Sequence, residues 1–208
     1  MGAQYFKYGK KEIDYLKSRD PILGAAIDKI GRLRREVRPD IFSALINSII
    51  GQQISSKAQA TVWARFTERF APISPKRIAL AAESDLQACG ISFKKAAYIK
   101  EIARTVHSGE LDLIDLQKQS DAEVCKRLSQ LKGIGVWTAE MLMIFSMQRP
   151  DIISMGDLAI IRGLKVLYRH RKITPQLFAK YKRRYSPYAT VASLYLWEIS
   201  SEDFKSRG

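Results

Sequence analysis

Two glycines one residue apart, Gly133 and Gly135, separate a polar run from a long apolar run in the segment LKGIGVWTAEMLMIF at 131–145. A glycine at a helix end supplies a positive φ without strain, and a second one beside the next helix lets a large group approach the backbone. The free N–H groups and the dipole of that next helix favour an anion. The pattern therefore predicts a phosphate-binding hairpin, with a plain connection between two helices as the alternative.

The residues around the two glycines fit the same interpretation. Ser120 or Asp121 can cap a helix that ends before the glycines, and the following helix begins near Val136. We expect Ile134 to point inward and join the two helices, and Thr138 to add a hydroxyl contact to the bound anion.

A second group able to do chemistry is the carboxylate of Asp157. It follows Gly156 and precedes an apolar-periodic run at 158–170, which is the pattern of a helix N-cap. A helix start also holds a carboxylate in fixed geometry beside backbone donors. Capping and a role in a reaction are therefore compatible at this position.

The elements that must position these groups are helices. Apolar residues recur at spacings of three and four in four long segments, at 41–53, 57–70, 94–109 and 158–170. Helix entries are marked by a capping residue or proline at Pro39-Asp40, Ser74-Pro75 and Thr174-Pro175. With no alternating strand pattern, the sequence predicts an all-α protein. The irregular segment 147–157 is a natural crossing between two helical lobes.

Composition limits the kind of partner. The 208 residues include 35 Lys and Arg against 21 Asp and Glu, a net charge of +14, which favours a polyanion such as nucleic acid over other partners. A generally basic, solvated surface is the alternative. Two cysteines, Cys89 and Cys125, are too few for a disulfide scaffold or a four-cysteine metal site, and we expect both to be small buried hydrophobes. Neither a membrane-spanning run nor a signal-peptide core is present, so we expect no membrane partner.

Three segments, in the same order as in the family, resemble the helix-hairpin-helix/Gly-Pro-Asp DNA glycosylases. LKGIGVWTA at 131–139 is similar to the family hairpin, although Lys132 stands where proline is usual and would place a cation beside the phosphate. IIGQQISSKA at 49–58 and GISFKKAAYI at 90–99 are similar to stretches of the 3-methyladenine glycosylases of type II. Asp157 lies 157 − 137 = 20 positions after Trp137, the spacing of the family's invariant aspartate.

The resemblance implies a reaction at an N-glycosidic bond. Asp157 would stabilise the oxocarbenium-like sugar and orient or deprotonate the attacking water. Bifunctional relatives carry a Schiff-base lysine where this sequence has Trp137, so we expect a monofunctional enzyme that leaves an abasic site. The resemblance also implies a monovalent cation, Na⁺ or K⁺, at the carbonyls of Leu131 and Gly133, and no other cofactor.

The resemblance assigns further roles on the DNA. Gln53, with Ile54 as an apolar neighbour, would fill the space left by a flipped base, while Gln52 braces the turn. A capped corner with two solvated glutamines is the alternative. For the base pocket, Trp137 and Trp197 would attract a cationic alkylated base by cation–π interaction, unless they pack in the core.

Three further residues bear on the range of substrates. Met141 stands where some relatives have an aromatic residue, Ala189 stands where many have arginine, and Phe42 also lines the expected pocket. The substrates expected are alkylated purines, with uracil, hypoxanthine or 8-oxoguanine as alternatives. A non-catalytic DNA-binding module with the same hairpin is the alternative from another class.

The resemblance also gives the organisation of the chain. Residues 38–150 would form a helical barrel that ends in the hairpin, and residues 1–37 with 151–208 a second lobe, with a DNA-binding cleft between them. We expect the compact form of the family, without an N-terminal β-domain or a four-cysteine iron–sulfur cluster. We expect a monomer that binds double-stranded DNA containing damaged bases, in the cytoplasm or nucleoid of a prokaryote or the nucleus of a eukaryote.

Overall fold

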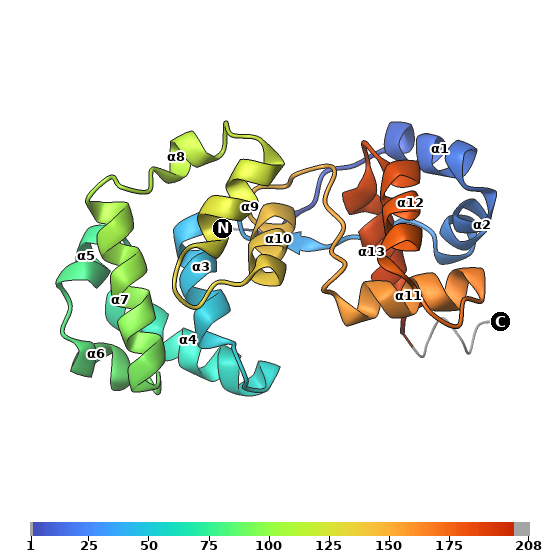
Figure 1. Ribbon diagram of the computed structural model, residues 1–208. Helices are drawn as coiled ribbons and strands as arrows, with labels where there is room; N and C mark the ends of the chain where they lie inside the picture. Colours follow the sequence, from blue (N-terminus) through green and yellow to red (C-terminus); the bar gives the residue numbers. More distant parts are fainter. Residues whose placement is uncertain (1, 202–208) are drawn as a thin grey trace. The chain divides into compact units, whose positions relative to one another are not determined.

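The computed structural model describes residues 2–201, which divide into two compact units (Figure 1). The first unit combines the described parts of residues 1–37 and 143–208, and the second is Arg38–Leu142. The boundary after the barrel therefore lies at 142/143, inside a helix, whereas the sequence placed it at 150/151. The prediction of an all-α class is confirmed, because thirteen helices lie within residues 2–201.

The first unit is built from both ends of the chain. Its elements are β1 (Gln4–Tyr5), α1 (Lys10–Arg19), α2 (Pro21–Ile30), β2 (Glu36–Val37), α11 (Leu158–Tyr168), α12 (Pro175–Tyr185) and α13 (Ala189–Ile199). α13 packs against α1, α2, α11 and α12, and its residues from Ala189 to Leu196 are buried. A helix that is apolar on nearly all sides belongs at the centre of a core.

α11 and α13 approach one another at backbone distance. A Cβ built on Gly163 would lie 2.3 Å from the carbonyl oxygen of Leu196, so only glycine allows this crossing. Because Asp157 is the N-cap of α11, the packing of α11 on α13 fixes the place of its carboxylate in the first unit.

A buried polar cluster also stabilises the first unit. Asp20, only 1% exposed, accepts hydrogen bonds from the Tyr168 hydroxyl at 2.6 Å and from Arg184 Nη1 at 2.7 Å. Tyr168 and Tyr185 share a hydrogen bond of 2.6 Å. Burial, followed by the neighbouring Tyr185 and Asp20, raises the pKa of Tyr168, so it stays protonated and can donate to the carboxylate.

The second unit is arranged around α7 (Phe93–His107), which packs against α3, α5 and α6. The other elements are α3 (Ile41–Ile50), α4 (Ser56–Phe70), α5 (Pro75–Leu80), α6 (Glu83–Gln87), α8 (Leu113–Leu116), α9 (Asp121–Ser129) and α10 (Val136–Phe145), whose last residues belong to the first unit.

The expected helix entries are confirmed. Asp40, Ser74 and Thr174 are the N-caps of α3, α5 and α12, and each side chain accepts a backbone N–H of the first turn. Capping is a local interaction, which is why the sequence alone locates it.

Some features differ from the sequence-based expectation or were absent from it. β1 and β2 form a two-stranded antiparallel pair, in which Gln4 faces Val37 and Tyr5 faces Glu36. Two residues per strand are too few to give an alternating pattern that a sequence could reveal. Cys89 is buried as expected, but Cys125 is only half-buried. No helix within residues 2–201 is long and apolar enough to cross a membrane.

Candidate nucleic-acid interface and active site

The predicted hairpin is present between α9 and α10. Ser120 caps α9 by accepting the N–H of Glu123 at 3.3 Å, and Ile134 is 3% exposed, so it points inward as expected. The N–H of Ile134 donates to the carbonyl of Leu131 at 3.0 Å, which closes the turn. These hydrogen bonds fix the conformation of the loop between the two helices.

The two glycines of the hairpin have different physical requirements. Gly133 has a φ of +86°, and a Cβ there would also lie 2.6 Å from Cδ2 of Tyr98 on α7. Gly135 is exposed, and nothing lies within 4 Å of the position of its Cβ. Gly133 is therefore needed by the protein itself, whereas the open backbone at Gly135 at the start of α10 can receive an external group.

Lys132 and Thr138 flank this open backbone. The ammonium of Lys132 lies 3.0 Å from a carboxylate oxygen of Glu101 on α7, and both side chains are largely exposed. An exposed ion pair contributes little to stability, so another anion can replace Glu101 as the partner of Lys132. Thr138 is half-buried in the first turn of α10.

The turn between α3 and α4 is fastened to the hairpin. The side-chain Nε2 of Gln52 donates to the carbonyl of Gly133 at 2.6 Å, so Gln52 has the bracing role expected of it. Lys95 Nζ donates to the carbonyls of Ile50 and Gln52 at 2.9 and 2.6 Å. Lys95 and Tyr98 both belong to the third family-like stretch at 90–99, so this stretch supports both the turn and the hairpin.

Gln53 stands at the tip of this turn in an unusual conformation. Its φ is +56°, one of three positive values at non-glycine residues among residues 2–201, and its side chain is exposed. Ile54 beside it is 39% exposed, and Ser55 caps α4 by accepting the N–H of Ala58 at 3.2 Å. A left-handed glutamine costs about 1–2 kcal/mol and is typical of functional sites.

The carboxylate of Asp157 is buried and accepts backbone hydrogen bonds. The residue is 7% exposed, and its Oδ1 accepts the N–H groups of Ala159 at 2.9 Å and Ile160 at 3.0 Å. This is the N-cap that the sequence predicted. The two donors hold Oδ1 at the start of α11, so the carboxylate has a fixed position before any substrate binds.

The loop that leads to Asp157 is held by α13, a feature that the sequence analysis missed. Asp151 accepts the Ser186 hydroxyl at 2.6 Å and the N–H of Ala189 at 3.1 Å. The N–H of Ile152 donates to Thr190 Oγ1 at 2.9 Å, within the first turn of α13. A buried Thr in an apolar helix is the one sequence signal that could have indicated such a partner.

The residues expected to hold the base differ in exposure. Trp137 is 48% exposed, which is inconsistent with a core tryptophan, and Met141 is half-buried on the same helix. Phe42 is 3% exposed and packs inside the second unit. In the first unit Trp197 is half-buried and stacks on Phe145, with ring centroids 5.5 Å apart and an interplanar angle of 27°.

The two carbonyls expected to bind a cation each accept one hydrogen bond already, from Ile134 N at Leu131 and from Gln52 Nε2 at Gly133. A carbonyl oxygen keeps a second lone pair, and Na⁺ and K⁺ take oxygen ligands, so the donor chemistry fits such an ion. Within residues 2–201 no group of three or more His, Cys, Asp or Glu could hold a metal ion.

The helical fold, the glycine hairpin before α10 and the buried aspartate that caps α11 are the features on which the resemblance to the glycosylase family depends. The chain belongs to the HhH-GPD superfamily of base excision DNA repair proteins, whose family model matches residues 46–187. The family expected from the motifs is therefore confirmed.

Individual proteins give the same assignment. The chain is 34% identical to DNA-3-methyladenine glycosylase 1 of Schizosaccharomyces pombe over 76% of this chain and 72% of that protein. It is similar to the crystal structure of a DNA-3-methyladenine glycosidase from Bacillus halodurans, with a TM-score of 0.89, 32% identity and coverage of 99% and 96% of the two chains. A Schizosaccharomyces pombe 3-methyladenine DNA glycosylase in complex with abasic DNA gives a TM-score of 0.76, 30% identity and coverage of 91% and 96%.

Proposed function

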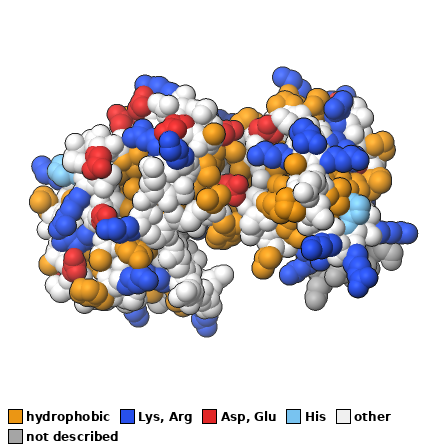
Figure 2. All heavy atoms as spheres, viewed as in Figure 1, with side chains coloured by type: hydrophobic (Ala, Val, Ile, Leu, Met, Phe, Trp, Pro, Cys, Tyr) orange, Lys and Arg blue, Asp and Glu red, His pale blue; other side chains and the backbone are white. Residues whose placement is uncertain are grey.

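We propose that this protein is a monofunctional DNA N-glycosylase of base excision repair, which hydrolyses the glycosidic bond of alkylated purines and leaves an abasic site. The similar proteins named above are 3-methyladenine glycosylases, and the solved complex of one of them contains abasic DNA, the product of such a reaction. Lys and Arg side chains are widespread on the visible face of each unit, which suits a DNA partner (Figure 2).

The observation that carries the proposal is the geometry of Asp157. Departure of the base builds positive charge on the sugar, and a carboxylate held by two backbone N–H groups stabilises that charge without having to reorganise. Its burial at 7% exposed strengthens the interaction, because a lowered dielectric screens charge less. The same carboxylate orients the water that attacks the sugar carbon.

The choice of water as nucleophile rests on two residues. Trp137 occupies the position at which bifunctional relatives have a Schiff-base lysine, and an indole cannot form that covalent bond. Lys132, the lysine of the hairpin, is paired with Glu101, and its role in this proposal is to meet a phosphate. Base loss and strand cleavage are therefore separate events in this proposal.

The substrate proposed is 3-methyladenine or a related cationic purine. Its positive charge weakens its own glycosidic bond, so one carboxylate suffices and no strong general acid is required. Trp137 on the second unit is exposed and has Met141, a polarisable side chain, on the same helix, so its electron-rich ring can attract such a base. The half-buried Trp197 of the first unit is assigned the same kind of contact on its own account. Phe42, assigned to the base pocket from the resemblance, is buried in the core of the second unit.

The remaining roles are proposed for the DNA itself. Gln53 and Ile54 fill the space that the flipped base leaves, and the hairpin from Lys132 to Gly135, with Thr138, holds a phosphate. Na⁺ or K⁺ at the Leu131 and Gly133 carbonyls would be the only ion, and would add positive charge beside that phosphate. The protein acts as a monomer wherever the cell keeps its DNA.

The test is release of bases from DNA methylated in vitro, with the freed bases identified by chromatography. Release of 3-methyladenine, with strands left intact until alkali is added, supports the proposal. DNA containing uracil, hypoxanthine or 8-oxoguanine provides the comparison substrates. Release of only one of these bases would make that base the substrate in place of 3-methyladenine. DNA binding without release of any base would make the chain a non-catalytic DNA-binding module.

A further inference from the structure

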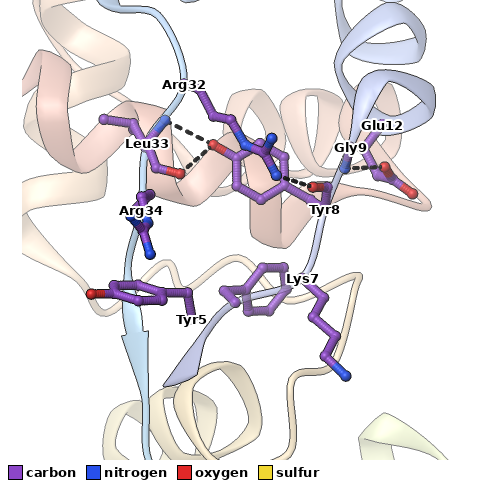
Figure 3. A pocket seen from close by; sticks show the side chains of 9 residues that line it. Tyr5, Lys7, Tyr8, Gly9, Glu12, Arg32, Leu33 and Arg34 are labelled. Carbon is purple, nitrogen blue, oxygen red and sulfur yellow. Dashed lines mark hydrogen bonds between the residues drawn. The ribbon is translucent and has the colours of Figure 1, made fainter. Parts of the chain in front are cut away.

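An open pocket on the first unit has no part in the proposed reaction. It has a volume of about 730 Å³ and lies between the segment that follows β1 and the segment that precedes β2 (Figure 3). Its chemically active side chains are those of Tyr5, Lys7, Tyr8, Glu12, Arg32 and Arg34.

The pocket carries an excess of positive charge. Its lining includes three cations, Lys7, Arg32 and Arg34, and one carboxylate, Glu12. The carboxylate is already engaged, because its Oε2 accepts the N–H of Gly9 at 2.7 Å. Within residues 2–201 none of the three cations has a carboxylate partner, so each can pair with an anion from outside the protein.

The two arginines are held in place by aromatic rings. The guanidinium carbon of Arg34 lies 4.1 Å from the centroid of the Tyr5 ring, and that of Arg32 lies 6.0 Å from the Tyr8 ring. Arg32 Nη2 also donates to the carbonyl of Tyr8 at 3.4 Å. At 4.1 Å the ring of Tyr5 covers one side of the Arg34 guanidinium, whose N–H groups remain available for a contact with phosphate. Arg32 makes the looser contact of the two.

The neighbouring Arg35 differs from Arg32 and Arg34 in its partner. Arg35 pairs with Glu198 at 3.0 Å, whereas Arg32 and Arg34 line the pocket. The walls are joined by Tyr8, whose hydroxyl donates to the carbonyl of Leu33 at 2.7 Å and accepts its N–H at 2.9 Å. Figure 3 shows these two bonds between the walls. The cations are therefore presented on a fixed frame, which reduces the entropy lost on binding.

We propose that this pocket binds a phosphate of the DNA backbone, at a second contact that is independent of the hairpin. A phosphate ester is the common chemistry, and it could belong to DNA or to a free phosphorylated molecule. The choice of DNA rests on the proposed function and on the net charge of +14. An open pocket also suits a phosphate that remains part of a strand.

The experiment compares two double variants for binding to an undamaged, fluorescently labelled duplex. R32Q/R34Q removes the two arginines of the pocket, and R171Q/R183Q removes two exposed arginines elsewhere in the same unit. We expect the log–log salt slope of R32Q/R34Q to be shallower than that of the control by about 0.9 for each phosphate that the variant no longer binds. The factor by which R32Q/R34Q binds more weakly than the control should therefore be about 3.5 times larger at 50 mM salt than at 200 mM salt, for each such phosphate.

A pair of variants at Tyr5 tests the stacking itself. Tyr5→Phe keeps the ring beneath Arg34 and should bind DNA as the wild type does, whereas Tyr5→Ala should bind more weakly, with part of the R32Q/R34Q effect. Thermal unfolding of each variant shows that a weaker binder is still folded. Equal binding by Tyr5→Ala and Tyr5→Phe would contradict the stacked geometry.

A second arm separates DNA from a free ligand. Inorganic pyrophosphate is titrated calorimetrically into the wild type and into R32Q/R34Q. Duplex affinities and slopes equal to those of R171Q/R183Q overturn the proposal, whether or not pyrophosphate binds. Because the duplex is undamaged, failure of the wild type to release methylated bases would overturn the proposed function without altering this comparison.

Discussion

Gln52 donates its side-chain amide to the carbonyl of Gly133 at 2.6 Å, across 81 positions of sequence. The bond joins the turn that carries Gln53 to the hairpin. Lys95 Nζ binds the Gln52 carbonyl from α7, and Tyr98, one turn further along α7, packs against Gly133. The two segments proposed to contact DNA therefore share one support inside the second unit, and should be disturbed together.

Gln52→Leu should test that shared support. The change removes the donor and leaves the Gly133 carbonyl without it, at a cost of about 1–3 kcal/mol in the free energy of unfolding. DNA binding and excision should both weaken. Urea unfolding measures the first effect, with Gln176→Leu on the exposed start of α12 as the control, expected within about 0.5 kcal/mol of the wild type. Equal unfolding free energies for the two variants would contradict the bracing role.

Gln53 should show a conflict between stability and function. Gln53→Gly relieves the positive φ of +56°, so the variant should be at least as stable as the wild type, yet it loses the side chain that fills the duplex. Gln53→Ala loses the same side chain and keeps the strain. Both should excise more slowly from duplex DNA, with undamaged DNA bound nearly as well. Excision at the wild-type rate by either variant would mean that another residue fills the space left by the flipped base.

Substitution of the two hairpin glycines should affect different properties, stability at Gly133 and DNA binding at Gly135. Gly133→Ala combines a positive φ with a clash against Tyr98, whereas Gly109→Ala meets a φ of +82° with nothing within 4 Å. Gly133→Ala should therefore be the less stable of these two. Gly135→Ala should fold normally but bind all DNA more weakly, with a log–log salt slope shallower by about one. Wild-type affinity and slope for Gly135→Ala would mean that the hairpin only joins two helices.

The sequence could predict what local chemistry determines. Helix entries, the turn at Gly133 and the N-cap at Asp157 depend on residues within a few positions of each other, and all are present. The family motifs could be recognised for the same reason. Long-range contacts were not predictable, because nothing local to Gly163 indicates that the backbone of α13 lies against it. The exposure of Trp137 is equally a property of the folded chain.

The nucleophile can be tested by trapping. Borohydride reduces a Schiff base to a stable bond, so an enzyme that uses a lysine becomes cross-linked to damaged DNA. With Trp137 in the lysine position, we expect no cross-linked band on a denaturing gel under conditions in which base release goes to completion. A known bifunctional glycosylase serves as the positive control. A stable cross-link that disappears in Lys132→Gln would identify the hairpin lysine as the nucleophile.

Asp157 can be tested so that capping and catalysis are separated. Asp157→Asn keeps an oxygen able to accept the N–H groups of Ala159 and Ile160, so the stability should change little, while excision should fall at least about a hundredfold because the negative charge is lost. Asp157→Ala should lose the cap as well, at about 1 kcal/mol in the free energy of unfolding. Damaged DNA should still bind to the Asn variant.

Asp112 provides a matched control for that experiment. Its Oδ1 caps α8 through the N–H groups of Ile114 and Asp115 at 2.7 and 3.0 Å, the same arrangement as at Asp157, but it is exposed. Asp112→Asn should therefore leave excision unchanged. Single-turnover excision from methylated DNA, with each variant in excess, measures the chemical step without product release. If Asp157→Asn excises as fast as Asp112→Asn, then Asp157 is only a cap and the catalytic carboxylate must be sought elsewhere.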